Sequence, residues 1–71
     1  MAPIPILLRD EYITLAQAVK VVGLVDSGGQ AKRFVRENNM MVNGTLEQRP
    51  GRKLVAGDHI VLADQEWVIQ L

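Results

Sequence analysis

The sequence predicts an α+β fold in which a helix–turn–helix unit packs on a small, mostly antiparallel β-sheet. The first half contains two segments with a helical spacing of apolar residues, and a capping signal precedes each of them. Short apolar segments separated by turn residues follow the second helix and predict the strands. A chain of 71 residues is long enough for one small hydrophobic core. We therefore expect a single domain over residues 1–71.

The first helix is predicted over Leu15–Val22, directly after a capping box formed by Thr14 and Gln17. In such a box the Thr hydroxyl accepts a backbone N–H of the first turn, and the Gln side chain reaches back to the N-cap. Gly23 is placed to end the helix in a left-handed conformation. The face that we expect to be buried consists of Leu15, Ala18, Val19 and Val22.

The second helix is predicted to begin at Gly28, because Ser27 and Gln30 form another capping box. A rotation of about 100° per residue places its apolar side chains on one face and its cations nearly opposite. The apolar residues are Ala31, Phe34 and Val35, and the cations are Lys32, Arg33 and Arg36. Like charges at this spacing repel each other, so the cations favour an anionic partner. A solvated helix face is the alternative interpretation.

Gly28 and Gly29 occupy the predicted first turn of this helix, where unpaired N–H groups and the positive end of the helix dipole favour anions. Without side chains, the two glycines leave room for a phosphate. Asp26 argues against such a site, because its carboxylate competes for the same N–H groups. The glycines could instead serve only to relax a tight turn. The spacing matches neither a Walker A loop nor a dinucleotide-binding fingerprint.

Asn43-Gly44 predicts a tight type I′ hairpin, because both central positions of this turn need a positive φ. The hairpin joins the apolar segment Met40–Val42 to Thr45–Glu47. Beyond it, turn residues separate three more predicted strands, which are Leu54-Val55, His59–Ala63 and Trp67–Leu71.

An edge strand is predicted over Ile4–Arg9, because Pro3 and Pro5 exclude a central position in a sheet. We expect the last strand to pair with Ile4–Leu8.

The charges are distributed unevenly along the chain, although the formal net charge is zero. Residues 32–53 hold six cations against two acids, a net charge of +4, and the rest of the chain carries −4. Three of these cations lie in a predicted basic loop, Gln48–Lys53, which could also be simply solvated. A basic segment between acidic ends is typical of a module that presents one surface to a polyanion. We expect the six cations to gather on one side of the molecule.

The composition argues against several other classes of protein. There is no cysteine for a disulfide or a thiolate metal site, and no group of side chains has the spacing of a metal or catalytic centre. His59, the only histidine, is expected to be a packed or surface residue. The N-terminal segment lacks the features of an export signal, and no apolar run is long enough to span a membrane. We expect a cytoplasmic monomer that is not an enzyme and uses no cofactor, metal or small-molecule substrate.

Several motifs together resemble a known family, the RNA-binding domain named after the fourth protein of the small ribosomal subunit, also called the αL RNA-binding motif. The matching residues are Leu24-Val25-Asp26-Ser27, Ala31-Lys32, Met41-Val42-Asn43-Gly44 and Gly57-Asp58. They cover roughly residues 13–62, and the chain is similar to a stand-alone copy of the domain. It departs from many members at Ile13-Thr14-Leu15, where they carry Arg-Leu-Asp, and at Gly28, where they carry Arg.

The resemblance implies RNA binding, whereas the charge distribution by itself implies only a polyanion. We expect a non-enzymatic module for structured RNA, ribosomal or transfer RNA being the examples that the family suggests. Only three aromatic residues are present, which disfavours base stacking and single strands. A helix–turn–helix DNA-binding protein and a protein-interaction adaptor are the alternatives. The residues expected to bind RNA are Gly28, Gly29, Lys32, Arg33, Arg36, Arg49, Arg52 and Lys53.

Overall fold

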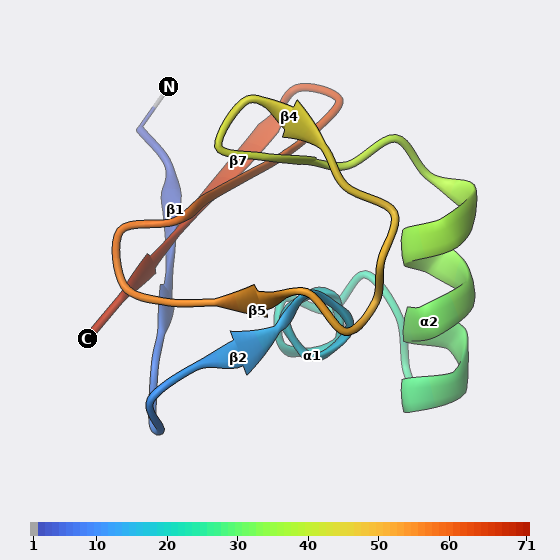
Figure 1. Cartoon of the computed structure of the whole chain (residues 1–71), viewed down its shortest axis with the longest axis horizontal. Coiled ribbons are helices and arrows are strands. Elements are labelled where there is room, and N and C mark those ends of the chain that lie inside the picture. The colour runs from blue at the N-terminus through green and yellow to red at the C-terminus, as the bar shows by residue number, and fades with distance from the viewer. Residues whose placement is uncertain (1) are drawn as a thin grey trace.

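The computed structural model describes residues 2–71 and has the predicted α+β architecture (Figure 1). Two helices lie between the N-terminal strands and a run of five further strands. The helices are α1 (Leu15–Val21) and α2 (Gly28–Glu37). The strands are β1 (Ile4–Leu7), β2 (Ile13–Thr14), β3 (Met41–Val42), β4 (Thr45–Leu46), β5 (Lys53–Leu54), β6 (His59–Leu62) and β7 (Gln65–Gln70).

Five strands form the main sheet in the order β1-β7-β6-β3-β4. All neighbours are antiparallel except β1 and β7, which run parallel with Ile4 opposite Trp67. The predicted pairing of the first and last strands is therefore confirmed, and β1 forms one edge of the sheet. β2 and β5 form a separate two-stranded sheet, in which Ile13 pairs with Leu54. β2 was not predicted from the sequence, because it consists of only two residues directly before α1.

α1 begins and ends through the local signals expected of it. Both hydrogen bonds of the capping box are present, since Thr14 Oγ1 accepts the Gln17 N–H and Gln17 Oε1 accepts the Thr14 N–H. At the other end, the Gly23 N–H donates to the Lys20 carbonyl and the Leu24 N–H donates to the Val19 carbonyl. This is a Schellman motif, which needs a left-handed residue, and Gly23 has a φ of +84°.

α2 also begins where predicted, but its capping box is only half formed. Ser27 Oγ accepts the Gln30 N–H at 3.2 Å, as expected. The Gln30 side chain, however, accepts the N–H of Asp26 rather than that of Ser27, at 2.9 Å. The bond thus reaches one residue further back and ties the helix to the connection that follows α1.

Several strand boundaries in the C-terminal half differ from the prediction, β5 and the start of β7 among them. β5 contains Lys53 and Leu54 but not Val55, because Val55 donates its N–H to the carboxylate of Asp58. β7 begins at Gln65, so the last turn consists of Ala63 and Asp64 and not of Asp64 and Gln65. Ala63 adopts a φ of +54°, which its sequence neighbours do not predict.

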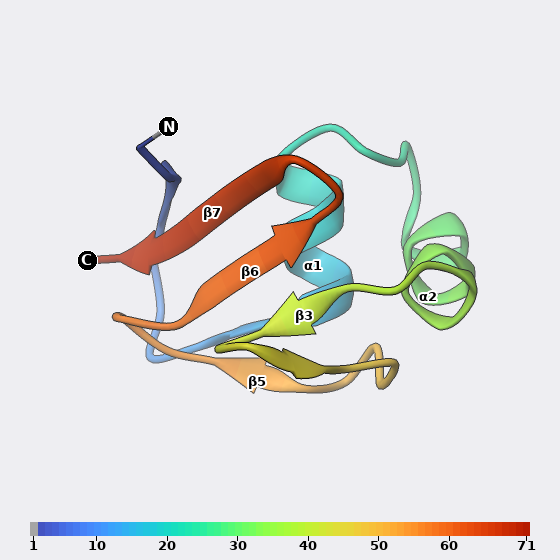
Figure 2. The same cartoon turned by 90° about the horizontal axis from the view of Figure 1, so that it is seen from above.

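The core lies between the main sheet and the helices. Figure 2 shows α1 behind the sheet and α2 to one side of it. Neither helix in the described part of the chain is long and apolar enough to cross a membrane. The most fully buried large side chains come from both layers and are Leu15, Val19, Val35, Met40, Leu54, Ile60 and Ile69.

Candidate nucleic-acid interface

The three cations of α2 lie on the exposed surface of the helix, while Ala31 and Val35 are buried beneath it. Arg33 Nε donates to Glu37 Oε1 at 2.6 Å, across one turn of the helix. Lys32 and Arg36 form no ion pair with any residue between 2 and 71. The helix therefore carries one neutralised and two uncompensated cations, where the sequence suggested three equivalent ones.

The cations of α2 also divide between two flanks of the helix. Arg33 lines a shallow depression with Phe34 beside the connection between α1 and α2. Helical periodicity places Lys32 and Arg36 on the other flank of the buried stripe. Figure 2 looks nearly along α2 and shows the loop between β4 and β5 on that flank, opposite the α1–α2 connection. Lys32 and Arg36 therefore face the side on which the basic loop Gln48–Lys53 lies.

The backbone of the β4–β5 loop is held against the start of α1. Arg49 and Arg52 close a turn, in which the Arg52 N–H donates to the Arg49 carbonyl at 3.2 Å. The first two N–H groups of α1, from Leu15 and Ala16, donate to the carbonyls of Arg52 and Pro50 at 2.9 and 3.0 Å. The loop thus caps α1, and α1 in turn determines where the two arginines emerge.

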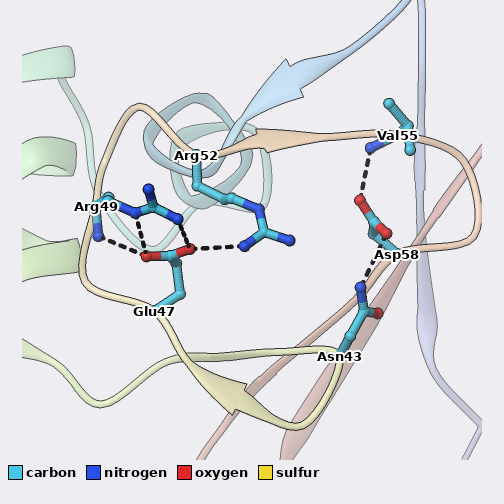
Figure 3. Close-up of polar contacts among 6 residues, drawn as sticks. All are labelled: Asn43, Glu47, Arg49, Arg52, Val55 and Asp58. Carbon is cyan, nitrogen blue, oxygen red and sulfur yellow. Dashed lines mark hydrogen bonds and ion pairs between the residues drawn. The ribbon is translucent and has the colours of Figure 1, made fainter.

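The two arginines of this loop converge on one carboxylate, that of Glu47. Arg49 approaches it through Nε and Nη2, both at 3.0 Å, and Arg52 through Nη1 at 2.9 Å. Figure 3 shows the carboxylate between the two guanidinium groups. The side chain of Glu47 is only 9% exposed, against 75% for Arg49. The hydrogen bonds from Arg49 and Arg52 lower the pKa of Glu47 to about 2, although burial opposes this shift.

Lys53, the last cation of residues 32–53, contacts an aromatic ring and not the carboxylate of Glu47. It is exposed at the start of β5, and its Nζ lies 4.8 Å from the centre of the Tyr12 ring. This distance is that of a cation–π contact, which leaves the charge in place. Lys53 thus extends the basic segment toward the two-stranded sheet.

Gly28 and Gly29 lie in the first turn of α2, as predicted. The Gln30 N–H is taken by Ser27, whereas the N–H groups of Gly28 and Gly29 have no acceptor within the described chain. A Cβ atom at either glycine would meet nothing within 4 Å, so the space beside the two Cα atoms is open. Within the described chain, the carboxylate of Asp26 does not accept a hydrogen bond from either glycine.

The ion pairs do not lower the net charge of residues 32–53. The count of +4 over residues 32–53 already includes Glu37 and Glu47, the two acids that form the pairs. Both views of the fold place α2 and the β4–β5 loop side by side (Figures 1 and 2). The ion pairs of Glu47 with Arg49 and Arg52 were not predicted from the sequence. The available signal was an acid placed two and five residues before arginines in a turn-forming segment.

His59, expected to be a packed or surface residue, is half-buried on β6. Its Nδ1 lies 2.7 Å from Glu66 Oε2 on the neighbouring strand. Among residues 2–71, no three His, Asp or Glu side chains come close enough together to hold a metal ion.

Comparison with known proteins agrees with this architecture. A family model described as the S4 domain matches residues 6–70. The chain belongs to the S4 domain family. The resemblance inferred from the sequence motifs is thereby confirmed, and the matched range includes every residue of the S4 domain that we place at the interface.

Two relatives of this S4 domain carry descriptive names. The chain is 44% identical over 54 residues to the "Probable ribosome maturation protein RlbA" of Bacillus subtilis (strain 168), and the match covers 76% of each protein. It is 33% identical over 55 residues to the "Putative RNA-binding protein YbcJ" of Escherichia coli (strain K12), which covers 78% of this chain and 79% of that protein. The similarity to both extends over most of their lengths.

Proposed function

We propose that this S4 domain is a non-enzymatic module that binds structured RNA through its phosphates. The observation that carries the proposal is the position of α2 beside the β4–β5 loop, because these two elements hold most of the cations of a chain that belongs to the S4 domain family. The names of the two relatives, one concerned with ribosome maturation and one with RNA binding, support it. Ribosomal RNA is accordingly the first RNA to test, and the cytoplasm is where such a protein would work.

Within the proposed interface, the residues have different tasks. Lys32 and Arg36 carry charges that no acid compensates within residues 2–71, so they supply most of the electrostatic attraction. Arg33 and Lys53 lie at the two margins of the proposed interface. The N–H groups of Gly28 and Gly29 offer hydrogen bonds to a phosphate at the positive end of α2. Arg49 and Arg52 contribute oriented guanidinium groups.

The state of the aromatic residues favours structured RNA over single strands. Trp67 is only 6% exposed, and Phe34 packs against the core. Tyr12, the third aromatic residue, has Lys53 over its ring. Tyr12 alone is 43% exposed, and a single ring with Lys53 over it does not form the platform of several aromatic side chains on which the bases of a single strand stack. Recognition of an A-form helix by its shape and its phosphates remains the mode that these side chains suit.

A titration at two salt concentrations tests the proposal. A labelled ribosomal RNA hairpin and a DNA duplex of matched sequence are titrated with the wild-type protein and with the double variant Lys32→Ala/Arg36→Ala. We expect preference for RNA, and a log–log salt slope smaller by about two for the double variant, because each phosphate contact contributes roughly one.

The matched control is Arg9→Ala/Lys20→Ala, which removes the same charge from exposed positions outside residues 32–53. Its salt slope should stay close to that of the wild type. Equal losses in the two double variants would show that only net charge matters, and binding independent of salt would refute the proposal.

A further inference from the structure

We propose that Glu47 is a positioning residue of the RNA interface, which holds Arg49 and Arg52 in the orientation that binds backbone phosphates. This inference rests on the proposed function and deepens it. It concerns a carboxylate, which would repel RNA if charge alone decided binding. Three features of this acid and its two arginines make such a role possible.

First, Glu47 is covered by the guanidinium groups of Arg49 and Arg52. Its carboxylate is 9% exposed, and two guanidinium groups lie on it from opposite sides (Figure 3). The Arg49 side chain is 75% exposed and the Arg52 side chain 37%. An approaching phosphate therefore meets N–H donors first and the carboxylate only behind them.

Second, both arginines keep N–H groups that can donate to a ligand. Arg49 uses Nε and Nη2 for Glu47, and Arg52 uses Nη1. Arg49 Nη1 and Arg52 Nε and Nη2 have no acceptor within residues 2–71. A guanidinium group can bind a carboxylate with one side and a phosphate with another, because its five N–H groups lie in one plane.

Third, hydrogen bonds fix the backbone beneath these side chains. The carbonyls of Pro50 and Arg52 accept N–H groups from α1, and the N–H of Glu47 itself donates to the Met40 carbonyl at 2.9 Å. The N–H of Arg49 also donates to the Glu47 carboxylate at 3.3 Å. With backbone and side chains both held, the arginines lose little further conformational freedom when RNA binds.

Glu47→Gln tests the inference, because electrostatics and positioning predict opposite signs. The substitution keeps the size of the side chain and raises the net charge of the protein by one. If only charge matters, RNA binds more tightly. If Glu47 positions the arginines, RNA binds more weakly, because an amide group meets a guanidinium where a carboxylate oxygen accepted its bond. We expect affinity for the ribosomal RNA hairpin to fall at least about fivefold.

Glu37→Gln is the matched control, since it also removes an acid that pairs with an arginine. The side chain of Glu37 is 58% exposed on α2. Its substitution should leave RNA affinity unchanged or increase it slightly. A Glu47→Gln variant that binds RNA as tightly as the wild type, or more tightly, would overturn the inference while leaving the proposed function intact. Absence of RNA binding by the wild type would refute both.

Arg49→Lys keeps the test decisive if Glu47→Gln fails to fold. It preserves the charge at an exposed position but cannot form the two-pronged bond to Glu47. We expect weaker RNA binding with an unchanged salt slope, and wild-type affinity would contradict the inference. Backbone amide NMR spectra establish that each variant is folded. The Arg49 Nε–H signal should exchange slowly with water in the wild type and rapidly in Glu47→Gln.

Discussion

The side chain of Asn43 donates from Nδ2 to Asp58 Oδ1 at 3.0 Å and so joins the β3–β4 hairpin to the turn that precedes β6. Each residue also accepts a backbone N–H from the segment around the turn before β6. Asn43 Oδ1 accepts the N–H of His59 at 2.9 Å. Asp58 Oδ2 accepts the N–H of Val55, also at 2.9 Å (Figure 3). Two motifs that lie fifteen residues apart in the sequence thus form one hydrogen-bonded unit.

This contact predicts coupled losses of stability. Asn43→Gly retains a residue that tolerates the φ of +53° observed there, and removes only the side chain. We expect Asn43→Gly and Asp58→Ala each to lower the free energy of unfolding by about 1–2 kcal/mol. The double variant should lose less than the sum of the two, by about 0.5–1 kcal/mol, because they share a bond. Urea unfolding measures all four proteins, and strictly additive losses would show that the contact contributes nothing.

The low pKa of Glu47 predicts a dependence of stability on acid. The pKa is about 2 in the folded protein and near the ordinary value of 4.5 in the unfolded chain. The unfolded chain therefore binds more protons between these values, so the contribution is complete above about pH 4.5 and is lost as the pH falls toward 2. We expect it to be on the order of 2 kcal/mol. Urea unfolding between pH 2 and 7 should show a steeper acid loss for the wild type than for Glu47→Gln.

Gly28→Pro tests the N–H groups at the start of α2. Proline is favoured at the first helical position, and Ser27 before it has the extended backbone that a following proline requires, with a ψ of 162°. The variant should fold but lack one donor. If a phosphate binds there, we expect RNA affinity to fall roughly tenfold, the effect of one hydrogen bond to a charged group. Gly28→Ala keeps the donor and should therefore bind RNA more tightly than Gly28→Pro, and equal affinity of both variants would exclude the N–H group from the interface.

Ala63→Gly should stabilise the protein. Ala63 has a φ of +54° in the turn between β6 and β7, a conformation that costs an L-residue about 1–2 kcal/mol. Glycine removes this strain but adds freedom to the unfolded chain, so we expect a net gain of up to about 1 kcal/mol. Thermal unfolding measures it. Gly51→Ala, at a turn glycine without positive φ, should not be destabilised by comparable strain.

The sequence by itself determined the elements whose signals lie within four residues. Thr14 and Gln17 start α1, Gly23 ends it, and Asn43-Gly44 forms the hairpin as predicted, with φ values of +53° and +82°. These features follow from local sterics and local hydrogen bonds, which a short segment carries with it wherever it packs. The family resemblance depended on the same short motifs and was confirmed.

Only the tertiary structure decided which residues meet across the chain. Ile13 pairs with Leu54 in a second sheet, and the carbonyls of Pro50 and Arg52 accept the first N–H groups of α1. Glu47 is buried beneath two arginines whose charges were counted as independent in the sequence. Such contacts depend on the packing of elements distant in sequence. A charge pattern gives the sum of the charges, whereas the fold decides which of them compensate one another and which remain for a ligand.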